Sequence, residues 1–186
     1  MRILLAGLAG AVAMFVWTAI AHMATPLGAI GFHQMPNEPA VLHTMNDSIG
    51  MKGGLYFFPW VDMSDPKAME KSEALEKANP SGILLYRGPG QGMDSDMTPM
   101  LVKEFLKQFV QALIAAWIAS MIAAGFVTRA GVVAAIGVSA SIATNVSYWT
   151  WYAFPLDFTL AAIIIEIVGA IVAGIAIAAL LPRKTA

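Results

Sequence analysis

The amino-acid sequence predicts an all-α membrane protein: a four-transmembrane-helix bundle with a small α+β extracytoplasmic domain between helices one and two. Three observations support this fold class. Hydrophobic residues make up 58% of the 186 residues and charged residues only 12%, whereas soluble domains carry roughly 25% charged residues. Four apolar runs each reach the length of about 20 residues that a helix needs to cross a bilayer. Basic and acidic residues also occupy different parts of the chain, which gives these runs a consistent orientation.

The predicted organisation divides the chain into seven segments. Only helices and closed barrels satisfy their backbone hydrogen bonds in lipid, and the apolar runs lack the alternation of barrel strands, so helices are expected. In chain order we expect a transmembrane helix at 1–24, an extracytoplasmic segment at 25–98, a second helix at 99–128 that begins outside and enters the membrane, a third at 129–150, an outer aromatic loop at 151–157, a fourth at 158–182 and a cytoplasmic tail at 183–186.

The first apolar run has an alternative interpretation as a cleaved signal peptide. Arg2 precedes it, and the small residues Ala19 and Ala21 lie near its end. However, its apolar core is longer than the roughly 7–15 residues of a signal peptide. Trp17 and His22 also suit the interface end of a retained helix. We therefore expect this segment to remain as a transmembrane helix.

The positive charges predict the orientation of the chain. Arg2 precedes the first helix, Arg129 lies in the turn between the second and third helices, and Arg183 and Lys184 follow the fourth, with no acidic residue in any of these places. Because basic residues mark cytoplasmic loops, both termini are predicted in the cytoplasm of a multi-pass protein of the cell (inner) membrane. Residues of roughly 25–100 are then extracytoplasmic.

Aromatic residues mark the outer end of the third helix. The stretch "YWTWYAF" contains four rings that we assign to the outer membrane interface, where amphipathic rings are favoured. These rings are Tyr148, Trp149, Trp151 and Tyr152.

The extracytoplasmic segment contains the pattern of a strand–helix–strand unit. Residues 54–60 and 82–88 are short apolar stretches bounded by glycines, which is typical of strands. Between them, residues 64–80 have a helix pattern with Ser64 or Asp65 as the N-cap. A helix between two strands would allow them to pair in parallel.

Small residues recur four positions apart in the apolar runs. Ala170 and Gly174 show this spacing in the fourth run, and Gly137 and Ser141 show it in the third. Because small residues at this spacing let membrane helices approach closely, we expect a compact bundle.

Glu166 is the one acidic residue well inside an apolar run, and it is the first candidate for a functional site. An intramembrane carboxylate normally faces a bundle interior or a water-filled cavity. We expect Gln111 and Asn145 at a comparable depth, with Gln108 and His22 nearer the surface. Such a group would form a proton-carrying or ligand-binding site. Alternatively, it is a polar contact between helices worth about 0.6–2 kcal/mol.

Histidines and methionines in the extracytoplasmic segment form a second candidate site. The sequence carries "HQM" and "HTM", which place His33 beside Met35 and His43 beside Met45. Imidazole and thioether ligands suit Cu(I), so copper is the one cofactor that the pattern suggests. Alternatively, these methionines fill irregular apolar contacts.

These patterns favour a non-enzymatic function. We expect an accessory, assembly or structural subunit of a membrane complex that acts through its outer segment, with the lipid bilayer and other membrane subunits or a second copy as partners. One alternative is a small transporter or proton-coupled carrier centred on Glu166, and a second is an extracytoplasmic copper-handling module. No nucleophile stands beside a base, and no basic block indicates a nucleic-acid partner.

Overall fold

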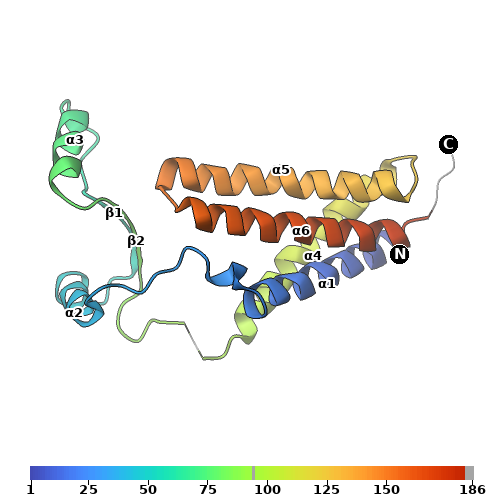
Figure 1. Cartoon of the computed structure of the whole chain (residues 1–186), viewed down its shortest axis with the longest axis horizontal. Helices are drawn as coiled ribbons and strands as arrows, with labels where there is room; N and C mark the ends of the chain where they lie inside the picture. The colour runs from blue at the N-terminus through green and yellow to red at the C-terminus, as the bar shows by residue number, and fades with distance from the viewer. Residues whose placement is uncertain (94, 183–186) are drawn as a thin grey trace. The chain divides into compact units, whose positions relative to one another are not determined.

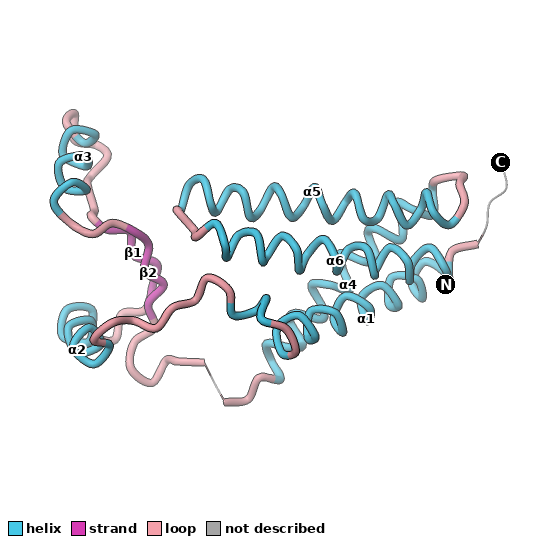
Figure 2. The backbone as a smooth tube through the Cα atoms, in the orientation of Figure 1, coloured by secondary structure: helices cyan, strands magenta, loops and turns pink. Residues whose placement is uncertain are grey.

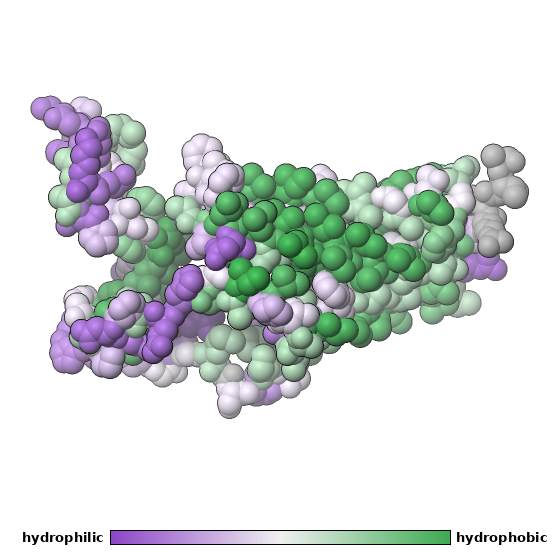
Figure 3. Space-filling model, in the orientation of Figure 1, coloured by the Kyte–Doolittle hydropathy of each residue, from purple (hydrophilic) through white to green (hydrophobic). Residues whose placement is uncertain are grey.

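The computed structural model describes residues 1–93 and 95–182, and the chain divides into two compact units. The first, here called the helix unit, joins Met1–Phe32 to the chain that follows Ser95. The second, the hairpin unit, comprises His33–Ser95. In Figure 3 apolar residues cover the visible face of the helix unit, whereas hydrophilic residues gather on the hairpin unit. The predicted cytoplasmic tail at 183–186 lies outside the described residues.

The helix unit contains four long helices and one short 3₁₀ turn (Figure 1). In chain order these are α1 (Arg2–Met23), η1 (Pro26–Ala29), α4 (Thr98–Met121), α5 (Phe126–Tyr152) and α6 (Leu156–Leu180). Among the described residues, α1, α5 and α6 are long and apolar enough to cross a membrane, which indicates a helical membrane protein. Helix α4 is not among them, so three of the four predicted spans are helices that could cross a membrane, and the predicted four-helix transmembrane bundle is not confirmed. Lys103, Glu104 and Lys107 near its start reduce its hydropathy.

The four long helices pack in the order α4, α1, α6, α5. Helix α1 packs against both α4 and α6, and α5 packs along α6 (Figure 2). The α5–α6 contact confirms the predicted role of small residues. A Cβ atom added at Gly137 would lie 2.1 Å from the Cβ of Ala170, and one at Gly174 would lie 2.7 Å from the carbonyl oxygen of Ala130. The core of the unit is accordingly rich in alanine, including Ala6, Ala11, Ala112, Ala115, Ala116, Ala119 and Ala173.

Arg129 lies inside α5 rather than in a turn. The second helix ends at Met121, and α5 begins at Phe126 after Gly125, three residues earlier than predicted. The Arg129 side chain is buried, with its Nη2 donating to the carbonyl oxygen of Ile122 at 3.0 Å and its Nη1 to that of Pro182 at 2.5 Å. Its charge therefore stabilises carbonyls at the ends of α4 and α6, which have no partner within their own helices.

The hairpin unit contains two helices and one pair of strands: α2 (Glu38–Ile49), β1 (Gly54–Phe58), α3 (Ala68–Ala78) and β2 (Gly82–Tyr86). The strands are antiparallel, with Gly54 opposite Tyr86 and Phe58 opposite Gly82. The predicted parallel pairing of these two strands is therefore wrong. The chain leaves β1 at Phe58 and re-enters opposite it at Gly82, so the segment with α3 is a long hairpin connection and not a crossover.

The start of α3 is held by Asp65, one of the two predicted N-caps. Asp65 Oδ1 accepts from the backbone N–H of Lys67 at 2.8 Å, and its Oδ2 accepts from Lys71 Nζ. The Lys71 side chain and the Lys67 amide lower the pKa of the Asp65 carboxyl. The regular helix begins at Ala68, so Asp65 organises the turn that leads into it.

Candidate functional site

A cavity of about 670 Å³ lies within the helix unit. It exists because α4 packs mainly on α1 while α5 packs mainly on α6, which leaves space between the two pairs. Its volume falls in the range of about 300–1,000 Å³ that is typical of small-molecule sites. The walls are formed largely by small residues of α4, α5 and α6, including Ala112, Ala115, Gly137, Ala140, Ala161, Ala162, Gly169, Ala170 and Ala173.

Glu166 forms a polar cluster on the α5–α6 side of this cavity. Asn145 Nδ2 donates to Glu166 Oε2 at 2.8 Å, and also to the carbonyl oxygen of Ser141 at 3.0 Å. Asn145 and Ser141 are buried, whereas Glu166 is exposed and lines the cavity with Ser141. The amide therefore holds one carboxylate oxygen. The other oxygen, Oε1, has no hydrogen bond among the described residues.

A second polar cluster lies on the α4 side. Glu104 Oε1 accepts from Lys107 Nζ at 2.7 Å and from Gln108 Nε2 at 2.8 Å. Gln108 Nε2 also donates to Thr18 Oγ1 on α1 at 3.1 Å. The Gln108 side chain is buried, and its Oε1 has no partner in the part of the chain that the structure describes. A buried acceptor without a partner costs about 1–3 kcal/mol.

The structure brings four of the five predicted polar site residues to one cavity. Glu166, Gln111, Gln108 and His22 all line it, and Asn145 lies directly behind Glu166. His22 packs against Gly28, where an added Cβ would lie 2.6 Å from His22 Nδ1. Only a glycine at this position lets η1 approach the imidazole so closely.

Sequence reasoning missed several polar residues of the cavity wall. They are Thr18, Ser141 and Thr144, together with Glu104 and Lys107, which the sequence suggests only as a charged helix start. Thr18 lies four residues before His22, a spacing that places both on one face of a helix. That spacing was the available signal, although hydroxyl groups are too common in membrane helices for it to single out a site.

The histidines and methionines proposed for copper lie in the hairpin unit. His33 and Met35 precede α2, whereas His43 and Met45 lie on it. Residues that are two positions apart in a helix are separated by about 200° around its axis. His43 and Met45 therefore point to different sides of α2 and do not form a ready pair of ligands.

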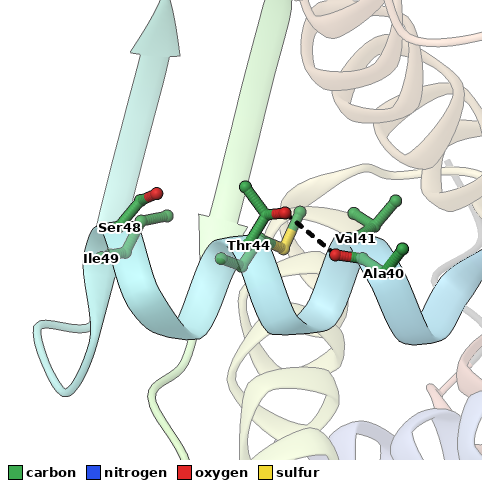
Figure 4. A pocket seen from close by; sticks show the side chains of 6 residues that line it. Ala40, Val41, Thr44, Ser48 and Ile49 are labelled. Carbon is green, nitrogen blue, oxygen red and sulfur yellow. Dashed lines mark hydrogen bonds between the residues drawn. The ribbon is translucent and has the colours of Figure 1, made fainter.

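The surroundings of His43 and Met45 also differ. His43 Nδ1 lies 3.0 Å from Asp47 Oδ2, whereas Met45 lines a small apolar groove with Val41 and Ile49 (Figure 4). No group of three or more His, Cys, Asp or Glu residues that could hold a metal occurs among the described residues. The copper hypothesis stays a prediction.

The interface aromatics occupy the last turns of α5. Tyr148, Trp149, Trp151 and Tyr152 are exposed, and α5 continues to Tyr152, so part of the predicted loop is helical. The helix ends at Ala153, which has a positive φ of 54°. Phe154 then folds back and stacks on Tyr148, with 5.4 Å between ring centroids. Their position at a membrane surface stays a prediction.

Comparison with known proteins identified no matching family model, no matching curated protein and no matching solved structure. The fold indicates a small helical membrane protein, and its helix unit contains a largely apolar cavity lined by a few polar side chains.

Proposed function

We propose that the protein is a membrane-embedded binding protein or carrier for a small amphipathic molecule, with Glu166 as its polar anchor. The observation that supports this function is the convergence of polar side chains from four helices on one cavity with apolar walls. Ligand sites combine mostly apolar walls with a few placed polar groups. Carboxylates within membrane-spanning segments usually face a bundle interior or a cavity, where they mark substrate or ion pathways.

The proposed topology places all four long helices in the bilayer of the inner membrane. Helix α4 packs along α1, and its charged residues fall within its first ten residues, at positions 103, 104 and 107. The remainder of α4 is apolar enough to complete the span, with Lys107 reaching toward the interface. Four spans place both termini on one side, which the basic residues at 2, 183 and 184 assign to the cytoplasm. The hairpin unit is then extracytoplasmic.

Filling the cavity tests this function. Ala162 lines it, so Ala162→Phe should remove the volume that a ligand needs. Ile164→Phe is the matched control, because Ile164 lies on the same helix, is 47% exposed and does not line the cavity. The purified full chain in nanodiscs would be titrated with a neutral amphipathic probe, 4-phenylbutanol, and binding measured against empty nanodiscs.

The expected result is saturable binding by the natural chain and by Ile164→Phe, with at least a tenfold weaker affinity for Ala162→Phe, about 1.4 kcal/mol. Helical circular dichroism would show that both variants are folded. Equal binding by both variants, or no saturable binding by the natural chain, would refute the cavity as a ligand site.

A second candidate function is the accessory or assembly subunit, which the hairpin unit favours. Leu55 and Leu85 stand opposite each other on one face of the hairpin and are 69% and 72% exposed, with Phe57 beside them. Apolar groups gathered in this way are typical of interaction surfaces. Purification in mild detergent should then recover other membrane subunits with the natural chain but not with Leu55→Ser/Leu85→Ser. A clean monomer from the natural chain would count against this function.

A further inference from the structure

We propose that the molecule bound in the helix-unit cavity is a monovalent organic cation, with an ammonium-type head that pairs with Glu166. This inference rests on the proposed binding function and specifies the chemical class of the ligand. It follows from the charges around the cavity, from the polar atoms that have no partner there, and from the nature of the walls.

The charges around the cavity leave one negative group without a counter-charge. Glu104 and Lys107 cancel each other through their 2.7 Å ion pair. His22 is the remaining titratable group of the wall and is counted neutral at pH 7. Glu166 forms no ion pair with a described residue, and its neighbour Asn145 supplies a neutral amide. The wall therefore carries a net charge of about −1, which attracts a cation and repels an anion.

The nearest buried arginine does not serve as the missing counter-charge. Arg129 donates to the carbonyl oxygens of Ile122 and Pro182, which lie at the C-terminal ends of α4 and α6. It does not line the cavity. The counter-charge must therefore come from outside the described chain.

Two acceptor oxygens of cavity-lining residues have no described partner. Glu166 Oε1 has no hydrogen bond among the described residues, because Asn145 contacts only Oε2. Gln108 Oε1 is buried and likewise has no described partner. The donors on the same groups are already used: Asn145 Nδ2 by Glu166 and Ser141, and Gln108 Nε2 by Glu104 and Thr18. The open oxygen of Glu166 therefore accepts a hydrogen bond from a bound ligand, which an ammonium group supplies and a carboxylate does not.

The walls indicate that this cation has an apolar body. Alanine and glycine residues of three helices form much of the cavity wall, and the cavity is far larger than a bare ion needs. A metal ion such as Na⁺ or Ca²⁺ would require several oxygen ligands at short distance, whereas one carboxylate oxygen can hold an ammonium group through a charge-assisted hydrogen bond.

Three probes with one apolar body test the inference: 4-phenylbutylamine, 4-phenylbutanol and 4-phenylbutanoate. Each would be titrated into the full chain in phosphatidylcholine nanodiscs at pH 7, with partition into empty nanodiscs subtracted. The amine should bind about tenfold tighter than the alcohol, and the carboxylate should bind weakest. Glu166→Gln should abolish the preference for the amine, so that amine and alcohol bind with similar affinities.

Two further variants separate charge at the site from folding and from surface charge. Glu166→Asp keeps the carboxylate and should retain the preference for the amine, so it also serves if Glu166→Gln does not fold. Asp157→Asn removes an exposed carboxylate from the same helix that does not line the cavity, and it should leave all three affinities unchanged.

The outcomes distinguish this inference from the proposed function. Equal affinities for amine and alcohol, or a preference for the carboxylate, would overturn the cationic ligand while leaving the cavity as a binding site. A preference for the amine that persists in Glu166→Gln would overturn the role of Glu166. If no probe binds saturably, both the inference and the proposed function fail.

Discussion

The close contact between α5 and α6 makes Gly137→Ala an informative substitution. A Cβ atom at position 137 would lie 2.1 Å from the Cβ of Ala170. Non-bonded carbon atoms rest about 3.5–4.0 Å apart, so the two helices would have to separate by about 1.4–1.9 Å at this point. Neither atom belongs to a flexible side chain that could rotate away. Overpacking of this kind costs about 1–3 kcal/mol.

Gly131→Ala supplies the matched control on the same helix. No atom lies within 4 Å of a Cβ added at Gly131, so this variant introduces the same methyl group without a clash. Alanine also gains about 0.5–1 kcal/mol over glycine in a helix interior, and it does so at both positions. The difference in unfolding free energy between the two variants therefore isolates the packing cost, and we expect Gly137→Ala to be less stable than Gly131→Ala by about 1–3 kcal/mol.

The assay is unfolding of the purified chain in mixed micelles with increasing sodium dodecyl sulfate, followed by tryptophan fluorescence and far-ultraviolet circular dichroism. A difference between the two variants below about 0.5 kcal/mol would refute the reasoning, because it is no larger than the ordinary effect of a surface substitution. In that case α5 and α6 would not approach each other at Gly137 in the membrane.

Three further predictions concern stability. Arg129→Ala should lower the free energy of unfolding by about 3–4 kcal/mol in the same assay, because two carbonyl oxygens lose charged hydrogen bonds of about 1.5–2 kcal/mol each. Arg129→Lys keeps the charge and should lower it less. Equal losses for the two variants would contradict this account. Trp17→Phe should cost about 1 kcal/mol by removing the 2.8 Å bond from its indole Nε1 to the carbonyl oxygen of Ile165, and an unchanged midpoint would argue against that bond. Because the folded-state pKa of the Asp65 carboxyl is lowered, the stabilisation that this carboxylate gives to the start of α3 is present above the unfolded pKa of about 3.9 and is lost as pH falls through the lower folded value. The protection of the Lys67 amide, measured relative to its intrinsic exchange rate, should therefore fall on acidification below about pH 4 in the natural chain. Asp65→Ala should already lack this protection at neutral pH and show little further change.

Much of the helix unit could be predicted from the sequence because its signals are local. A run of apolar residues is sufficient to indicate a membrane helix, and the spacing of Gly137 and Ala170 within their runs was sufficient to suggest close contact. The boundaries were less certain. Helix α5 begins at Phe126 because Gly125 precedes it, although the apolar run continues across the break. Apolarity does not distinguish a short turn from a helix when both are made of alanine, valine and glycine.

The hairpin unit was harder to predict because its structure depends on contacts that are distant in sequence. The direction of strand pairing is not encoded in either strand, and the helical segment between them was compatible with both arrangements. Helix α2 was not predicted at all. Its signals are Glu38 and Pro39 in the first turn, residues that are typical of a helix start.

The site could be predicted only in part for a similar reason. Glu166 is unusual in its own run, so the sequence singled it out. Glu104 and Lys107, however, look like ordinary residues at the interface end of a helix, and only the packing of α4 on α1 brings them to the same cavity as Glu166.

The helix unit is assembled from parts that are made at different times, which has a consequence for biogenesis. Helix α1 leaves the ribosome first, but its partners α4 and α6 follow the entire hairpin unit. At about 5–20 residues per second, α6 emerges on the order of 10 s later. Gly7 and Gly10 of α1, which contact the later helices in the folded structure, lack these partners until α4 and then α6 are made. Helices α5 and α6 are consecutive in the chain, so they pair without waiting for a later segment, whereas the contact between α1 and α6 forms only after the last helix is made.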